Sequence, residues 1–274
     1  MKKFFRTAFV CLTVLILLVF LAACGKKSSA GDPQKIYVGL TGQIAPPINF
    51  LDANGNRAGY EYRLLDAIDE RLEEYEFEYQ FQEIRVVLMG LDNGRLDIGV
   101  NSFEWNEERA AKYLFSDDGY LDSTNYVTVK DTTTGISSLD DLQGKRVIVW
   151  PGSNQAYIVD QYNLKHPENP IEEILTDSMD IMLRSVDSGD ADATILDKFN
   201  IRKFNAERDL NFKTVGEPVS ESLCYFLFAK DRTGLRDAVN RAFKEMIESG
   251  QFKKLQEEIL DGYFEELARS RRQG

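Results

Sequence analysis

Segments typical of strands and helices alternate along this chain, and the alternation limits the possible folds more than any other feature. Segments 35–40 (KIYVGL) and 75–81 (YEFEYQF) have strand patterns, and apolar residues at helical spacing lie between them at 62–74. A helix, a Gly turn, an Asp and a strand follow one another at 86–100, and this order returns at 181–196. The alternation predicts an α/β fold with largely parallel sheets, and the repeat predicts two lobes of similar build.

The N-terminus has the features of a secretory signal peptide. Three basic residues lie within the first six positions, and an apolar run follows at 8–23. The last part of this run, LAAC at 21–24, resembles the lipobox of bacterial lipoproteins, in which the peptide is cut before a Cys that is then acylated. We therefore expect a signal peptide at 1–23, a lipid on Cys24 and a flexible tether at 24–34. An uncleaved anchor helix is the alternative and gives the same topology.

Composition narrows the classes of partner and chemistry. The predicted signal peptide carries three basic and no acidic residues, so its removal changes the net charge from −12 to −15. An acidic body argues against nucleic acid or an anionic lipid surface as a partner. Beyond Cys11 and Cys24 only Cys224 remains, so no disulfide framework is available.

Motifs for catalysis, metals and cofactors are missing from the sequence. His166 is the only His, and neither a zinc-type Cys/His spacing, a P-loop nor a G-x-S-x-G motif is present. The sequence therefore predicts a protein that is not an enzyme and has no catalytic residue, no metal and no cofactor.

Several segments resemble, in the same order, the extracellular solute-binding proteins of bacterial polar amino-acid ABC importers, known as family 3. They are APPINF (45–50), GRLDIGVNSFEWNEER (94–109), FSDDGY (115–120), LDDLQGKRVIV (139–149), GDADATILD (189–197) and a pair of C-terminal helices. The similarity extends from about residue 35 to residue 264. It implies a type II periplasmic-binding-protein-like fold, with two lobes, two hinge strands and a ligand cleft between the lobes.

The resemblance also implies domain bounds, partners and a location. The first lobe would be discontinuous, at 35–126 plus 226–268, and the second would lie at 131–219. Hinge closure around the ligand would be read by a membrane permease with its ATPase. We expect a monomer on the extracellular face of the cell membrane, held by its N-terminal lipid, and the lipobox favours a Gram-positive cell.

Two charged residues are candidates for ligand recognition. Asn106 is a suitable N-cap, and Arg109 then lies at the positive end of a helix, where its guanidinium would complete an anion site. In the family the equivalent Arg binds the ligand α-carboxylate, and an Asp at the position of Asp197 binds the α-amino group. The alternatives are a surface Arg paired with Glu104 or Glu108, and an Asp197 that only caps a helix.

The remaining candidates surround this pair. Ser153 and Asn154, in the PGSN loop, could contact the carboxylate, and Asn101 and Ser102 stand where family members touch the ligand through their backbone. Ordinary turn and cap chemistry is the alternative for these four residues.

Glu104 and Trp150 depart from the family pattern, and the first loop (41–47) lacks the usual acidic and aromatic residues. In one interpretation Glu104 replaces the missing acid and Trp150 supplies an apolar or cation–π face, which favours an amino acid with a basic or long polar side chain. In the other, the ligand is a non-standard carboxylate.

Other functions remain open at this point. The same fold serves as a sensor in receptor kinases, so a sensor accessory is possible. Some relatives are cyclohexadienyl dehydratases, in which a cleft carboxylate acts as general acid, a role that Glu104 could take.

Overall fold

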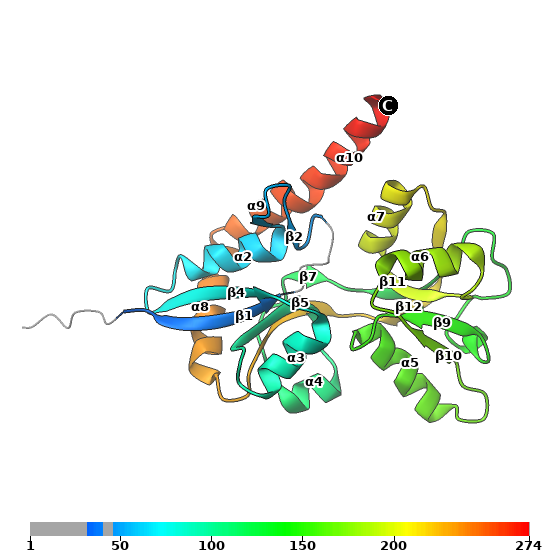
Figure 1. Ribbon diagram of the computed structural model, residues 1–274, viewed down its shortest axis with the longest axis horizontal. Helices are drawn as coiled ribbons and strands as arrows, with labels where there is room; N and C mark the ends of the chain where they lie inside the picture. Colours follow the sequence, from blue (N-terminus) through cyan, green and yellow to red (C-terminus); the bar gives the residue numbers. More distant parts are fainter. Residues whose placement is uncertain (1–31, 41–45, 274) are drawn as a thin grey trace, which may run out of the picture. The chain divides into compact units, whose positions relative to one another are not determined.

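The structure, a computed structural model, describes residues 32–40 and 46–273 (Figure 1). The predicted signal peptide, the lipid site at Cys24, most of the tether and part of the first loop lie outside the described residues. From Lys35 to Gly274 the chain forms one unit, which carries the elements below. No helix within 32–40 or 46–273 combines the length and the apolar character that a membrane crossing requires.

The first lobe is built on a six-stranded sheet. Its path is β4 (Tyr75–Phe81), β1 (Gln34–Leu40), β5 (Ile98–Glu104), β13 (Leu223–Phe228) and β6 (Leu114–Phe115), and β7 (Leu121–Asp122) also pairs with β13. β1 and β5 are parallel, whereas β13 is antiparallel to β5. Ile36, Val38 and Leu40 of β1 are fully buried, as expected for a strand inside a covered sheet.

Three helices cover this sheet with apolar stripes: α2 (Tyr60–Asp69), α3 (Ile84–Asp92) and α8 (Thr233–Glu248). The short α4 (Glu107–Lys112) has no such stripe, and its buried residue is Arg109. In α8 the buried side chains recur at helical spacing: Leu235, Ala238, Val239, Ala242, Phe243 and Met246. A small hairpin pairs β2 (Phe50–Leu51) with β3 (Arg57–Ala58).

The second lobe has two sheets joined by one bridge. β11 (Thr194–Asp197), β8 (Asn125–Lys130) and β12 (Phe212–Ser220) form one sheet in that order, and β9 (Arg146–Val149) pairs with β10 (Glu172–Leu175). Val147 bridges to Ala193, which links the two sheets. The short helix η1 (Asp140–Leu142) precedes β9, and α5 (Asn154–Lys165), α6 (Met179–Ser188) and α7 (Lys198–Arg208) follow β9, β10 and β11.

The prediction of largely parallel sheets is wrong. β8 is antiparallel to both β11 and β12, and β13 is antiparallel to β5. A crossover helix between neighbouring strands makes them parallel, but β5 and β13 are separated in sequence by the whole second lobe. The direction of β13 is therefore not set by a crossover helix.

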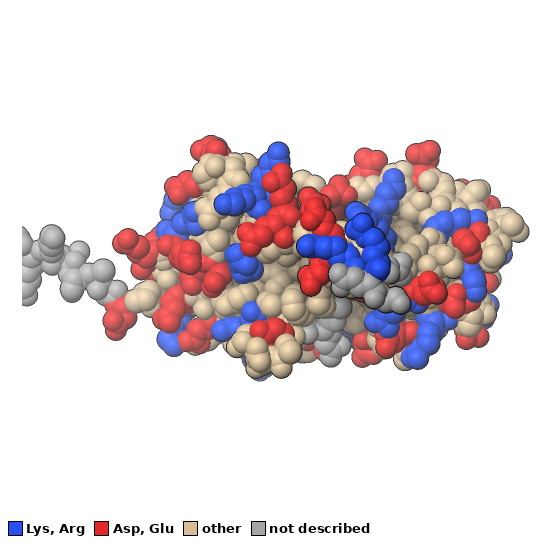
Figure 2. Space-filling model, turned by 90° about the horizontal axis from the view of Figure 1, so that it is seen from above, with Lys and Arg blue, Asp and Glu red and all other residues tan. Residues whose placement is uncertain are grey.

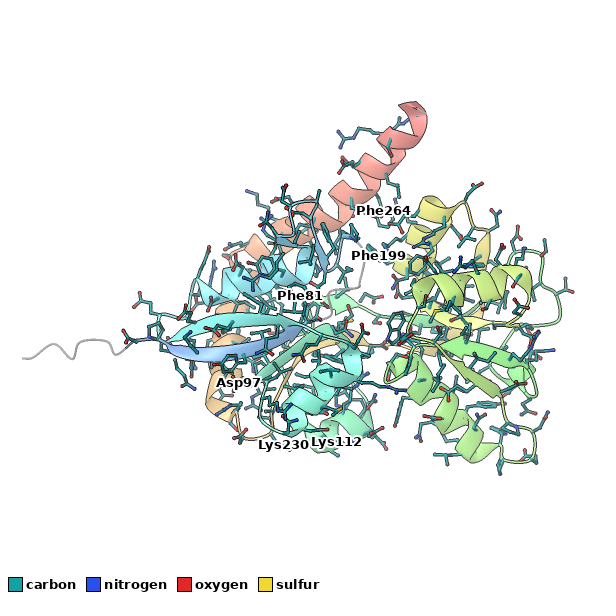
Figure 3. The ribbon with its side chains drawn as sticks, viewed as in Figure 1. Phe81, Asp97, Lys112, Phe199, Lys230 and Phe264 are labelled. Atoms are coloured by element: carbon teal, nitrogen blue, oxygen red, sulfur yellow. The ribbon has the colours of Figure 1, made fainter. Side chains whose placement is uncertain are left out.

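The C-terminal helices continue further than the sequence pattern indicated. Gly250, in the left-handed region with φ 76°, separates α8 from α9 (Gln251–Gln256), in agreement with the expected pair of C-terminal helices. A π-helical turn, η2 (Glu257–Asp261), then leads into α10 (Gly262–Gln273), which includes the basic residues near the C-terminus. Phe264 of α10 contacts Phe199 of α7, with ring centroids 5.1 Å apart (Figure 3).

Acidic side chains are spread across the face shown in Figure 2, with basic ones between them. This distribution agrees with the net negative charge of the sequence.

Candidate functional site

A cavity of about 450 Å³ brings the sequence-predicted residues together. This volume falls within the range of about 300–1,000 Å³ that is common for small-molecule sites. The first lobe lines it from β5 and α4, and the second from the ends of β9 and β11 and from α5, α6 and α7. All the candidates are among the lining residues: Asn101, Ser102, Glu104, Arg109, Trp150, Ser153, Asn154 and Asp197.

Arg109 is held in place by both ends of α4. At the N-terminus the predicted cap is present, since Asn106 Oδ1 accepts a hydrogen bond from Arg109 N at 2.8 Å. At the C-terminus the Lys230 ammonium donates to Ala110 O at 3.1 Å, and Lys230 lies beside this helix in Figure 3. Because α4 has only six residues, its dipole is small, and the guanidinium itself supplies most of the positive charge.

The Arg109 guanidinium is buried against neutral groups. Its side chain donates to Glu104 O at 2.8 Å and to Gly152 O at 2.9 Å, and it lies over the Phe103 ring, 5.1 Å from the centroid. Arg109 is only 6% exposed, and burial lowers the pKa of its guanidinium. An Arg nevertheless stays charged at neutral pH.

The two alternative ion pairs of Arg109 are not observed. Among the described residues, no carboxylate oxygen lies within 4 Å of its guanidinium, and Glu108 instead pairs with Lys112 at 2.8 Å. The two carbonyl partners satisfy N–H groups without neutralising the charge. An anion in the cavity would therefore meet a buried positive charge already held in position.

Asp197 ends β11 and caps α7. Its Oδ1 accepts from Asn200 N at 2.8 Å and its Oδ2 accepts from Asn200 Nδ2 at 2.6 Å. The capping alternative is thus present in full, although the residue also lines the cavity. Burial raises the pKa of the Asp197 carboxyl, which no basic side chain approaches within 4 Å among the described residues.

Glu104 connects the two lobes. It is 2% exposed, and its Oε2 accepts from Asn125 Nδ2 and Asn154 Nδ2, both at 2.8 Å. Gln155 Nε2 donates to Oε1 at 3.3 Å. Burial raises the pKa of Glu104, while these amide donors and the Arg109 charge oppose the rise. Asn154 is positioned in turn by Asn106, whose Nδ2 donates to Asn154 Oδ1 at 3.1 Å.

The four remaining predicted residues differ in burial and in hydrogen bonding. Trp150 is half-buried and packs against one apolar cluster of each lobe. Ser153 caps α5, because its Oγ accepts from Ala156 N at 3.1 Å. Asn101 and Ser102 are half-buried at the cavity, and Ser102 has a left-handed backbone with φ 47°.

Sequence reasoning missed the contribution of α7. Phe199, Lys203 and Phe204 line the cavity. The sequence contained a signal that could have identified α7. Ligands of open α/β sheets bind beyond the carboxyl ends of strands, and α7 begins directly after β11. Asn125 and Gln155, the other amides around Glu104, carry no sequence signal of comparable strength.

Comparison with known proteins identifies the family. The model of "Bacterial extracellular solute-binding proteins, family 3" matches residues 36–262. The chain is 32% identical to the L-cystine-binding protein TcyJ of Bacillus subtilis, over 90% of this chain and 93% of that protein. It is 33% identical to the L-cystine-binding protein TcyK of the same organism, over 91% and 94% of the two chains.

Solved structures give the same fold. A structure titled "Putative L-Cystine ABC transporter from Listeria monocytogenes" is 34% identical and has a TM-score of 0.77, covering 83% of this chain and 96% of that one. An ancestral arginine-binding protein bound to arginine is 25% identical with a TM-score of 0.72, covering 84% and 99%. The predicted two-lobed fold is confirmed, as is the expectation of a binding protein rather than an enzyme. This chain belongs to the bacterial extracellular solute-binding proteins of family 3.

Proposed function

We propose that this protein is the amino-acid-binding component of an ABC importer and that its ligand is L-cystine. Arg109 binds a ligand α-carboxylate, and Asp197 binds the α-ammonium group with help from the nearby Glu104. The lobes, at 35–126 plus 226–268 and at 131–219, close around the ligand. The closed form then delivers the ligand to a permease that is coupled to an ATPase.

The observation that carries this proposal is the buried guanidinium of Arg109. Burying a charge is costly unless it gains a partner, and the described part of the chain places two carbonyl oxygens and the Phe103 ring, but no carboxylate, in contact with this one. A ligand carboxylate can accept two parallel hydrogen bonds from a guanidinium and place a negative charge in direct contact with it, which Glu104 supplies only from a longer distance.

The choice of cystine combines the names of the relatives with the lining of the cavity. Two relatives more than 30% identical over nine-tenths of this chain are named as L-cystine-binding proteins. Cystine has an ammonium and a carboxylate at each end and an apolar disulfide between them. The cavity offers charged groups together with Trp150, Met179, Phe199 and Phe204. Sulfur makes favourable contacts with aromatic rings, which suits such a ligand.

A binding assay with matched ligands tests the proposal. Isothermal titration calorimetry would compare L-cystine with cystamine, which lacks the carboxylates, and with 3,3′-dithiodipropionate, which lacks the ammonium groups. We expect binding of L-cystine only, because each analogue leaves either Arg109 or Asp197 without its partner. Thermal shift against arginine, glutamine and the other amino acids supplies the control, since a ligand that binds the native form raises Tm. A shift with arginine and none with cystine would overturn the ligand assignment.

We further propose that Cys24 carries a lipid that holds the protein at the extracellular face of the membrane as a monomer. The lipobox-like segment 21–24 supports this proposal. Metabolic labelling with a palmitate analogue, compared between the wild type and Cys24→Ser, tests it, and equal labelling of the two proteins would refute it.

A further inference from the structure

The strand that lines the cavity is interrupted where it reaches the ligand site. On β5, Glu104 pairs with Cys224 and Phe103 with Tyr225, but Gly99 pairs with Leu227. The register therefore shifts by two residues, and the extra residues fall within 100–102 of β5. Bulges of this kind redirect the backbone and are common beside functional sites.

Ser102 gives this bulge its shape. It has φ 47°, and Asp209 is the only other non-glycine residue with a positive φ among those described. The left-handed region is disfavoured for Ser and persists only where the surroundings fix it. The Ser102 amide is consequently turned away from the β-ladder and into the lobe.

A buried carboxylate receives that amide. Glu61 of α2 is fully buried, and its Oε1 accepts from Ser102 N at 2.6 Å, from Ser102 Oγ at 2.9 Å and from Tyr120 Oη at 2.6 Å. Its Oε2 accepts from Asn49 Nδ2. The amide and the hydroxyl of Ser102 thus both donate to one carboxylate oxygen, and the amide has a second, longer contact with Tyr120 Oη at 3.1 Å.

The core of the first lobe fixes the position of this carboxylate. Glu61 lies in the first turn of α2, where the helix dipole favours a negative charge. The helix begins after Gly59, whose φ is 113°, and a Cβ there would lie 2.1 Å from Ile48 O. Tyr120 is held as well, because Tyr60 Oη donates to Tyr120 O at 2.6 Å. Neither partner of Ser102 can shift without disturbing the core.

We propose that Glu61 is a positioning residue for the ligand, which holds the bulge at Asn101 and Ser102 in the shape that the first lobe presents to the amino-acid end of the ligand. Glu61 is not among the residues that line the cavity, so it acts through Ser102. The inference rests on the proposed function and extends it to a residue that does not touch the ligand.

Matched variants separate positioning from general stability. Glu61→Met removes both acceptor oxygens at similar volume, and we expect the Kd for L-cystine to rise about tenfold or more, the loss of roughly one charge-assisted hydrogen bond. Glu61→Gln keeps an oxygen for Ser102, so its Kd should stay within about threefold of the wild type. The control is Asp97→Leu. Asp97 is a carboxylate just before β5 that is 4% exposed, accepts from Tyr37 N and Arg232 Nε, and does not line the cavity. This variant should lower Tm and leave Kd unchanged within about twofold.

A rescue and a ligand-free measurement complete the test. Ser102→Gly adopts a positive φ without strain, so it should recover part of the affinity lost in Glu61→Met. Tyr120→Phe offers a milder disruption if Glu61→Met does not fold. Hydrogen exchange should show a protected Ser102 amide in the wild type and faster exchange there in Glu61→Met.

The outcomes are distinct. Wild-type affinity in a folded Glu61→Met, or an unprotected Ser102 amide in the wild type, overturns the positioning role. Equal losses of affinity in Glu61→Met and Asp97→Leu would also overturn it, because both would then reflect stability. Failure of the wild type to bind any amino acid overturns the proposed function instead, and the exchange at Ser102 still decides whether Glu61 holds the bulge.

Discussion

Arg109 of the first lobe and Asp197 of the second present opposite charges to the cavity, but the two groups are held in different ways. The Arg109 guanidinium contacts two backbone carbonyls, Glu104 O of β5 and Gly152 O of the loop before α5. In the second lobe the Asp197 carboxylate caps α7 through Asn200. From this difference we expect Arg109 to serve mainly the proposed ligand and Asp197 to serve both the ligand and its own helix.

Removing the guanidinium gives the sharpest test of this difference. Arg109→Ala should weaken L-cystine binding by about 100-fold or more, because breaking a buried charge pair costs about 2–5 kcal/mol. Arg109→Lys should also bind weakly, since an ammonium group cannot replace the bidentate hydrogen bonding of a guanidinium to a carboxylate. Calorimetry gives Kd, and circular dichroism checks the fold. Near wild-type affinity of Arg109→Ala would show that the carboxylate binds elsewhere.

Two variants at Asp197 separate its two roles. Asp197→Asn keeps an oxygen for the Asn200 amide but loses the charge, so we expect about a tenfold loss of affinity with little change in stability. Asp197→Ala also removes the cap and should lower the free energy of unfolding by about a further 1 kcal/mol. Urea denaturation and calorimetry measure the two effects. If Asp197→Asn bound normally, Asp197 would be a cap only.

Glu104 lies on β5 of the first lobe, but its donors come from β8 and α5 of the second lobe. In Glu104→Gln an amide group would face the donors of Asn125 and Asn154. We expect a loss of about 1–3 kcal/mol in stability and a loss of affinity smaller than that of Asp197→Asn. If Glu104→Gln were as stable as the wild type in urea denaturation, the side-chain amides of Asn125 and Asn154 would be able to flip and present their oxygens to the new amide.

The pH dependence of binding distinguishes the two carboxyl groups from Arg109 and is the smallest expected effect. Burial raises the pKa of both Asp197 and Glu104, so on acidification they take up protons earlier than ordinary carboxyl groups and bind an ammonium group more weakly. The Arg109 contact does not titrate there. Ligand affinity should fall severalfold toward acid pH, and Asp197→Asn should show a flatter profile.

The stability of the ligand-free protein should change in the opposite direction. A carboxyl whose folded pKa lies above its unfolded value contributes stability that is full below the unfolded pKa and is lost as pH rises through the folded pKa. Asp197 and Glu104 should therefore favour the ligand-free fold at lower pH. Thermal melts of the ligand-free protein at several pH values would measure the stability, and the Tm increase caused by ligand would follow the affinity. If stability and affinity both fell toward acid pH, Asp197 and Glu104 would not be the groups responsible.

Much of the fold could be predicted because local signals agreed with it. The cap at Asn106, the break at Gly250 and the strand–helix alternation all depend on neighbouring residues, and the structure has each of them. The direction of β13 could not be predicted, because no local pattern records which strand it will meet after the second lobe.

The sequence by itself determined the kinds of charge at the site and their places at the ends of helices and strands. Arg109 and Asp197 could be selected from motif and position alone. Only the tertiary structure decided what surrounds them: carbonyls around Arg109, amides from two elements around Glu104, and the Glu61 carboxylate under Ser102. The physical reason is that hydrogen bonds and burial depend on contacts between residues far apart in the chain, whereas caps and periodicity depend on near neighbours.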